Sequence, residues 1–169
     1  SYTGKIDAAY TEKKFYKESI NGVNIIRVPV PEFTKSSKVS RIKNILTYYK
    51  NARKATKMAG NQDYVFTISQ PPIMGGMLGV YGKHKLRTDD GNRPKLIYCI
   101  QDFNPEQTMA VNYVNNKLIT NTMMSFDKKN CRESDLVITV GRDLVETLKN
   151  RFKDSEVPNH TMINNWIDE

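Results

Sequence analysis

The sequence predicts an α/β fold in which helices alternate with the strands of a doubly wound, parallel sheet. Two observations lead to this prediction. Residues 96–100 form an unbroken apolar run, and the segment DLVITV at residues 135–140 is another strand of the buried type, as expected for strands covered on both faces. Segments with helical signals separate these strands from their neighbours, and such alternation favours parallel strands joined by right-handed crossovers.

The individual elements follow from local signals along the chain. Residues 1–19 are polar and weakly patterned, which indicates a loop with at most one helical turn, and Asn21-Gly22 marks a turn. The predicted strands are residues 23–30, 63–69, 96–100, 135–140 and 160–164. The predicted helices lie between residue 37 and Gly60-Asn61, over 73–86, over 105–118 and 122–131 with a break near Thr120-Asn121, and over 141–152.

The segment from Lys95 to Glu106 is the centre of the predicted sheet. In open α/β sheets, ligands bind at the carboxyl ends of the strands, and Asp102 stands at such an end. Pro105 suits the first turn of the next helix. Asp102 is therefore either the cap of that helix or a functional carboxylate, and the two roles are compatible.

Charge is unevenly distributed along the 169 residues, whose formal net charge is +8. Residues 1–62 hold 13 Lys and Arg against 4 Asp and Glu, a net charge of +9, whereas residues 63–169 hold 13 against 14, a net charge of −1. A basic half joined to a neutral half indicates an anionic partner for one face, such as nucleic acid, an anionic membrane surface or a phosphate-bearing substrate.

A basic amphipathic helix is predicted within residues 33–62, which contain no acidic residue. Apolar residues at 42, 45, 46 and 49 follow helical spacing, and Ser37 or Ser40 is expected to cap the helix. Its basic residues are Lys35, Lys38, Arg41, Lys43, Lys50, Arg53, Lys54 and Lys57. Either the helix packs on the sheet with a solvated basic face, or that face docks on anionic lipid headgroups.

Two glycine-containing segments have alternative interpretations. Gly75, Gly76, Gly79 and Gly82 fall within one predicted helix, where they allow close packing on a strand or leave room for a ligand. They do not form the dinucleotide fingerprint, which opens a helix. Gly141, which begins the last predicted helix with Arg142, either simply starts that helix or places free N–H groups around an anion.

Composition argues against several other classes. The two cysteines are far apart in sequence and favour reduced thiols over a disulfide framework. With two histidines they give no metal-ligand spacing, so no metal site is predicted. The chain has no apolar run of about 18 residues, as a membrane-spanning helix requires, and no visible signal peptide.

Six pieces of the chain, in this order and spacing, resemble the amino-terminal Rossmann-like domain of retaining GT-B glycosyltransferases of family 4, the capsule and exopolysaccharide type. They are NGVNIIRVPVP, RIKNIL, DYVFTISQPP, LIYCIQDFNPE, SDLVITVGRDLVETLKNRF and MINNWIDE. The resemblance implies a mostly parallel sheet with helices on both faces, a domain over residues 1–164 and a linker beginning at 165–169. It also implies that about 45 residues before Ser1, as in an ordinary βαβ unit, and a second domain after Glu169 are missing.

What the resemblance implies about function concerns the full enzyme. It moves a sugar from a nucleotide-sugar to a lipid-linked saccharide acceptor at the cytoplasmic face of a membrane, and this fragment is inactive alone. The second domain binds most of the donor, so no cofactor is expected here. Asp102 matches a catalytic or acceptor-orienting position. The cleft-lining positions are Ser69, Gln70, Pro71, Asn104, Gly141 and Arg142.

Two other functions and one assembly remain open. A nucleic-acid-binding α/β module rests on the basic half and its tyrosines, although no recognised nucleic-acid-binding motif occurs and no nucleic-acid partner is predicted. A different α/β enzyme such as a hydrolase lacks the G-x-S-x-G signature. Unpaired sheet edges, expected if the central strand is missing, predict a dimer through those edges, exchanged elements or a rearranged sheet.

Overall fold

The computed structural model describes residues 4–12, 14–104, 106 and 116–165. The chain folds into two compact units, residues 1–60 and residues 61–169, called unit 1 and unit 2 below. Most of the helix predicted over 105–118 and nearly all of the linker predicted from residue 165 lie outside the described residues.

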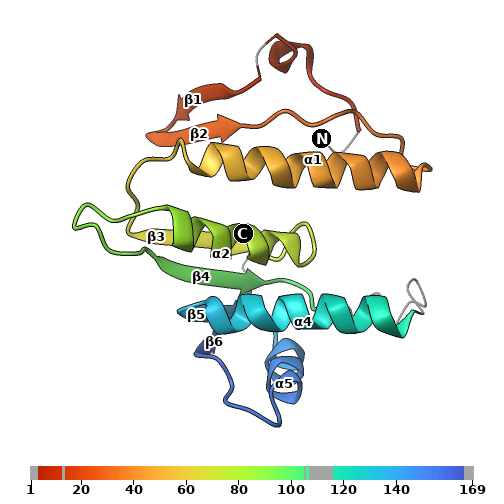
Figure 1. Ribbon diagram of the computed structural model, residues 1–169, viewed down its shortest axis with the longest axis vertical. Helices are drawn as coiled ribbons and strands as arrows, with labels where there is room; N and C mark the ends of the chain where they lie inside the picture. The colour runs from red at the N-terminus through yellow and green to blue at the C-terminus, as the bar shows by residue number, and fades with distance from the viewer. Residues whose placement is uncertain (1–3, 13, 105, 107–115, 166–169) are drawn as a thin grey trace. The chain divides into compact units, whose positions relative to one another are not determined.

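Unit 1 contains a β-hairpin and one long helix (Figure 1). Its elements are the 3₁₀ helix η1 (Ala8–Tyr10), β1 (Tyr16–Ile20), β2 (Val23–Arg27) and α1 (Lys38–Thr56). β1 and β2 pair antiparallel, and Ile20 lies opposite Val23. Asn21 and Gly22 between them both have positive φ, 51° and 81°, as the tightest hairpin turns require. The turn predicted at Asn21-Gly22 is therefore confirmed.

The strand predicted over residues 23–30 differs in length and in partner. It ends at Arg27, and it pairs with β1, which lies in a segment predicted to be a loop, rather than joining the parallel sheet. The two-residue turn brings β1 beside β2 directly, whereas parallel pairing needs a long crossover. Pro29 and Pro31 lack the N–H group that a longer ladder would use.

Helix α1 begins and is oriented through polar side chains. Ser37 is its N-cap, and the Ser37 hydroxyl accepts a hydrogen bond from the Ser40 backbone N–H at 3.3 Å, which confirms one of the two predicted caps. The Asn44 side-chain amide donates to the Pro31 carbonyl at 2.6 Å, and that of Asn51 donates to the Pro29 carbonyl at 2.7 Å. These two amides lie about two turns apart on one face of the helix, and they fix which side of α1 faces the chain after β2.

Unit 2 is a four-stranded parallel sheet interleaved with helices, which confirms the predicted α/β class. Its elements are β3 (Tyr64–Ile68), α2 (Met74–Lys85), β4 (Lys95–Ile100), α4 (Lys117–Glu133), β5 (Leu136–Thr139), α5 (Arg142–Arg151) and β6 (His160–Met162). The strand order is β3-β4-β5-β6. Each strand pairs in parallel with the next along the chain.

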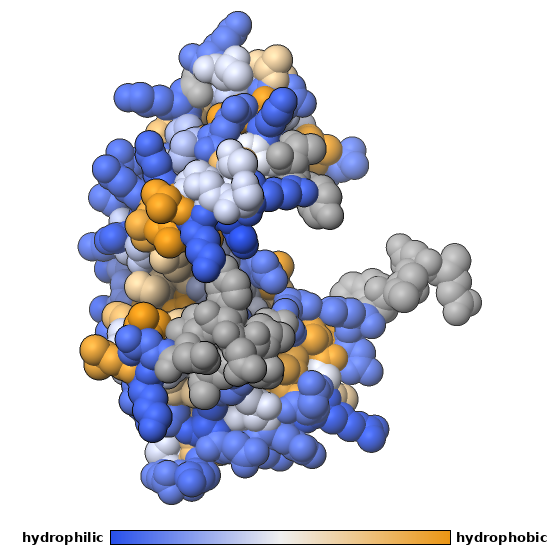
Figure 2. Space-filling view, turned by 90° about the vertical axis from the view of Figure 1, so that its right-hand side faces the viewer, coloured by the Kyte–Doolittle hydropathy of each residue, from blue (hydrophilic) through white to orange (hydrophobic). Residues whose placement is uncertain are grey.

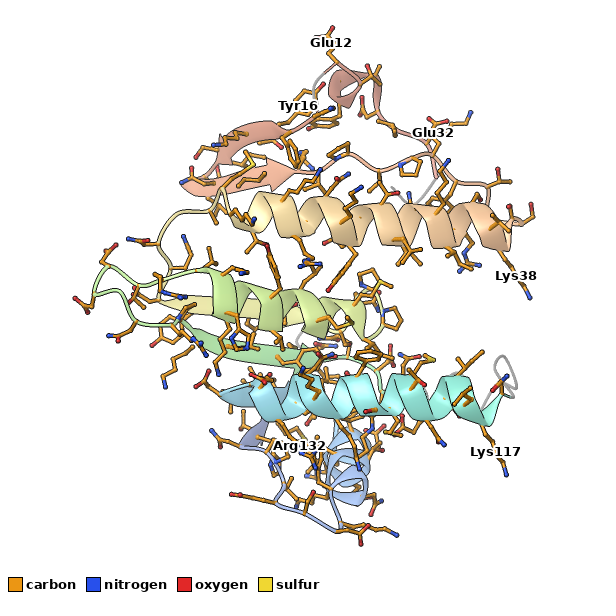
Figure 3. All side chains as sticks on the ribbon, viewed as in Figure 1. Glu12, Tyr16, Glu32, Lys38, Lys117 and Arg132 are labelled. Carbon is orange, nitrogen blue, oxygen red and sulfur yellow. The ribbon has the colours of Figure 1, made fainter. Side chains whose placement is uncertain are left out.

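One predicted break is wrong. α4 continues through Thr120-Asn121, from Lys117 towards Arg132, both labelled in Figure 3. The helix instead begins after Asn116, whose side-chain oxygen accepts hydrogen bonds from the backbone N–H groups of Leu118 and Ile119. Thr120 and Asn121 thus stand in and just past the first turn, where hydroxyl and amide side chains are well tolerated.

The three described helices of unit 2 contact one face of the sheet. The register places Tyr98 beside Val137, and both belong to a core cluster with Cys131 of α4 and Leu148 of α5. A methyl group at Gly79 of α2 would lie 2.4 Å from Thr67 Cγ2, on the same sheet face, so this glycine supports the close-packing interpretation.

The opposite sheet face is open at β3. Tyr64, Phe66 and Ile68 alternate along that strand and are exposed. Helices on both faces, as the resemblance implies, are therefore not seen within the described part of unit 2.

Both cysteines are free and buried, as predicted for reduced thiols. Cys131 has no exposed surface. Burial, reinforced by the nearby Asp127 carboxylate, raises the pKa of the Cys131 thiol far above its usual range. The thiol is thus protonated and unreactive in the folded chain.

Asp135 ties the start of β5 to its surroundings. Its carboxylate accepts from the Leu96 N–H at 2.8 Å and contacts Lys83 Nζ at 2.8 Å and Lys95 Nζ at 3.3 Å. Burial alone would raise the pKa of Asp135, but these hydrogen bonds outweigh it and hold that pKa below its usual range.

Asp135→Asn is expected to lower the free energy of unfolding near pH 7 by about 1.5–3 kcal/mol, because it removes a charge-assisted network. The lowered pKa means that this stabilisation is present above the unfolded-state pKa of about 3.9 and is lost as the pH falls through the folded-state value. The difference from wild type should therefore shrink in urea titrations at about pH 3. Asp90→Asn, in the exposed loop before β4, is the control, and an unchanged difference at low pH contradicts the assignment.

Candidate functional site

The carboxyl edge of the unit 2 sheet gathers the polar residues that follow its strands. Because the strands are parallel, their carboxyl ends share one edge. Ser69 follows β3, Gln101 and Asp102 follow β4, Gly141 follows β5, and Asn165 comes after β6. We therefore take this edge as the candidate site.

Hydrogen bonds join three of these strand ends. The Ser69 N–H donates to the Cys99 carbonyl at 2.9 Å, and the Ser69 hydroxyl accepts from the Gln101 N–H at 3.1 Å. The Asn165 side-chain amide donates to Gln101 Oε1 at 3.1 Å. Ser69, a predicted cleft residue, is thus buried and holds the edge together, while Gln101 and Asn165 were not among the predicted site residues.

Asp102 stands half-buried at the tip of β4. Among the described residues, none forms a hydrogen bond or ion pair with its carboxylate. Its interpretation as a helix cap concerns a helix beginning at Pro105, which lies outside the described residues. The carboxylate is consistent with contact to a ligand, and its role remains a prediction.

The loop after β3 is tightly constrained. It contains Gln70, which is exposed, and a cis peptide bond joins Gln70 to Pro71. Ile73 has a positive φ of 65°, which is unfavourable for a β-branched residue and costs on the order of 1–3 kcal/mol. Asn130 offsets part of this cost, because its side-chain amide donates to the Ile73 carbonyl at 3.0 Å. Such strain recurs at ligand-binding loops.

Two predicted cleft positions look different in the structure. Asn104 is buried, and its carbonyl accepts from Arg151 Nη2 at 2.7 Å, so it fixes the loop from inside. At Gly141, an added methyl group would lie 2.5 Å from Asp143 Oδ1. The helix α5 therefore already has a carboxylate at its first turn, which disfavours an external anion there and supports simple helix initiation. Arg142 is exposed beside it.

A buried ionic network lies beneath this edge. The Arg151 and Asp127 side chains are 2% and 3% exposed and form an ion pair. Arg151 Nε also donates to Glu106 at 2.6 Å, and its guanidinium lies 4.1 Å from the centre of the Phe103 ring. Tyr98 Oη donates to the other Asp127 oxygen at 2.8 Å. Arg151 therefore links α5, α4 and the chain that follows β4.

The network shifts the pKa values of its members in physically clear directions. Burial opposes the charged Arg151 guanidinium, but the hydrogen bonds to Glu106 and the charge of Asp127 outweigh it and raise the pKa of Arg151. Burial and the same Asp127 charge raise the pKa of Tyr98 well above its usual range. Arg151 is hence charged and Tyr98 neutral at any physiological pH.

Sequence reasoning missed this network because its members are far apart, with Asp127 and Arg151 separated by 24 positions. One signal was available. Thr120, Asp127, Asn130 and Cys131 fall on one face of α4, and that face is buried. A carboxylate on a buried helical face requires a partner of opposite charge. The sequence therefore indicates that Asp127 pairs with a cation, but it does not indicate that the cation is Arg151.

Other kinds of site are less well supported by the described residues. They contain no group of three or more His, Cys, Asp or Glu side chains placed to hold a metal ion. No helix within them is long and apolar enough to cross a membrane. Three hollows, of about 390, 370 and 550 Å³, have all their described lining residues in unit 1.

Comparison of the chain with protein-family models, with curated proteins and with solved structures finds no match in any of the three. The candidate site is thus characterised by its own geometry.

Arg151→Met is expected to lower the free energy of unfolding by about 3–5 kcal/mol, because it leaves the buried Asp127 carboxylate without its counter-charge. Lys149→Met, an exposed cation on the same helix, should change it by less than about 0.5 kcal/mol. Chemical denaturation followed by circular dichroism measures both. A loss for Arg151→Met as small as that of the control would mean that the ion pair contributes nothing.

Proposed function

We propose that this chain is the acceptor-side half of a retaining GT-B glycosyltransferase, with a Rossmann-like sheet that has helices on both faces in the complete domain. The observation that supports it best is the carboxyl edge of the parallel sheet, where Ser69, Gln101 and Asn165 are hydrogen-bonded and Asp102 has no partner among the described residues. Ser69 is buried and holds this edge together, while the amide and carboxylate groups beside it suit the hydroxyl groups of a sugar.

The proposed reaction transfers a sugar from a nucleotide-sugar to a lipid-linked saccharide at the cytoplasmic face of a membrane. Asp102 hydrogen-bonds the acceptor hydroxyl or orients it towards the donor. Gln70 and Pro71 border the acceptor, and Arg142 stands on the side where the donor domain would close. The donor itself is bound by a second domain that follows Glu169, so residues 1–169 alone transfer no sugar.

A nucleic-acid-binding module is the alternative, and the basic character of unit 1 is the observation that favours it. The polar edge of unit 2 argues for the transferase, because it lies in the unit that carries no net positive charge. Residues 63–169 have a net charge of −1.

The transferase proposal is tested on the full-length gene product, by transfer of radiolabelled sugar from nucleotide-sugars to lipid that partitions into organic solvent. Asp102→Asn should lower kcat at least about 100-fold, because acid–base and orienting groups contribute that much. Asp90→Asn changes the same chemical group at the opposite edge of the sheet and should leave kcat unchanged.

Two outcomes contradict the proposal. One is a gene product without transfer activity towards any nucleotide-sugar. The other is micromolar binding of a nucleotide-sugar by residues 1–169 in calorimetry, which would place the donor site in this half.

We also propose that chains associate through the β3 edge. Among the described residues β3 pairs with β4 alone, and its exposed Tyr64, Phe66 and Ile68 form an apolar strand without a protecting charge. Light scattering of residues 1–169 should give the mass of a dimer, and Phe66→Lys should give a monomer. Val23→Lys, at an exposed strand position of unit 1, should stay dimeric, and a monomeric wild type at all concentrations rejects the idea.

A further inference from the structure

Helix α1 presents aliphatic side chains to solvent. Val39, Ile42 and Leu46 are 77%, 57% and 52% exposed. Their spacing of three and four residues places them in one stripe along the first half of the helix. Ile42 and Leu46 belong to the apolar set predicted for α1 but are exposed, whereas Ile45 and Tyr49 of the same set are half-buried.

The side of α1 that packs within unit 1 is mixed, and the half-buried Ile45 lines a hollow there beside Asn44. Asn44 and Asn51 donate to the Pro31 and Pro29 carbonyls, and Ala55 is the buried residue of the helix. Pro29 and Pro31 lie between β2 and α1, outside both elements, so the two amide donors satisfy carbonyls that would otherwise be costly to bury. Rotating α1 to hide its aliphatic stripe would break both hydrogen bonds. The exposure of the stripe is therefore built into the unit.

Basic side chains surround the stripe. At about 100° per residue, Lys43, Lys50 and Arg53 fall within about 60° of the Val39 direction, and all three are exposed. The guanidinium of Arg53 also lies 5.7 Å from the centre of the Tyr49 ring. Lys54 and Lys57 extend the basic region at the end of the helix.

The rest of the basic set lies elsewhere around the helix. Lys38 stands at its start (Figure 3), while Lys35 and Arg41 line the hollow of about 390 Å³ beside Phe33. The face of the molecule in Figure 2 shows apolar patches, in orange, scattered among hydrophilic side chains, in blue.

We infer that the outward face of α1, defined by Val39, Ile42, Leu46, Lys43 and Lys50, docks on an anionic lipid bilayer. The aliphatic side chains enter the boundary between headgroups and acyl chains, and the ammonium groups bind lipid phosphates, each near-surface cation strengthening binding about fivefold. Residues 33–62 contain no acid that would repel such a surface. This inference rests on unit 1 and does not depend on the proposed transfer reaction.

A bilayer fits this face better than a nucleic acid does. Nucleic-acid surfaces need cations together with aromatic or hydrogen-bonding side chains that reach bases. The centre of this face is aliphatic, and Tyr48 and Tyr49 are half-buried. Transfer of aliphatic side chains out of water lowers the free energy, and the interior of a bilayer offers such an apolar environment.

Flotation of residues 1–169 with lipid vesicles tests the inference. The chain should float with vesicles of phosphatidylcholine and phosphatidylglycerol, and binding to pure phosphatidylcholine should be at least about 10-fold weaker. The double variant Ile42→Ser/Leu46→Ser should weaken binding to the anionic vesicles at least about 10-fold. The double variant Lys43→Gln/Lys50→Gln should weaken binding and also make the remaining binding less dependent on salt concentration. Leu118→Ser, an exposed aliphatic residue at the start of α4, is the control and should bind like wild type.

Thermal melting followed by circular dichroism shows whether a variant that fails to bind is still folded. Because Ile42, Leu46, Lys43 and Lys50 are all exposed, each variant should melt like wild type. Absence of wild-type flotation overturns the inference. So does equal binding to both vesicle types, or unchanged binding of Ile42→Ser/Leu46→Ser. Displacement of the chain from anionic vesicles by duplex DNA or RNA at low salt would assign the face to nucleic acid. Conversion of a dimer to a monomer by Ile42→Ser/Leu46→Ser would assign it to a second copy of the chain.

Discussion

The pairing of Arg151 with Asp127 is the constraint on which unit 2 depends. A buried guanidinium must be matched by carboxylates and carbonyls, and its partners come from α4, from Glu106 and from the Asn104 carbonyl. One side chain therefore determines where the chain goes after β4. Because Asp102 lies between that strand and Asn104, the position of the candidate site residue follows from a charge that lies outside the site.

The parallel sheet could be predicted because its strands carry local signals. Residues 96–100 are apolar without alternation, and they form the buried strand β4 between β3 and β5. The antiparallel hairpin could be predicted only in part. Asn21-Gly22 indicated its turn, but β1, with Lys17 and Glu18 at its centre, has the composition of a loop and becomes a strand through its pairing with β2.

The candidate site shows the same division between local and distant information. Ser69 and Asp102 could be placed at strand ends from the sequence, since parallel strands end at a common edge. The bond from Asn165 to Gln101 spans 64 residues and has no local signal. In α1 the helical spacing of the apolar residues was predicted, but the exposure of Ile42 and Leu46 was not. It depends on two asparagine side chains that donate to the Pro29 and Pro31 carbonyls, and these distant contacts have no local signal.

Cys131 gives unit 2 an intrinsic reporter of its own opening. With no exposed surface and a thiol held protonated, this residue cannot meet an alkylating reagent while α4 stays on the sheet. If alkylation is faster than reclosing, the labelling rate gives the rate at which α4 separates from β4 and β5. If reclosing is faster, the labelling rate reports the equilibrium population of the open form. Mass spectrometry of the alkylated thiol would thus follow local unfolding beside the ion pair of Arg151 and Asp127, without an engineered cysteine.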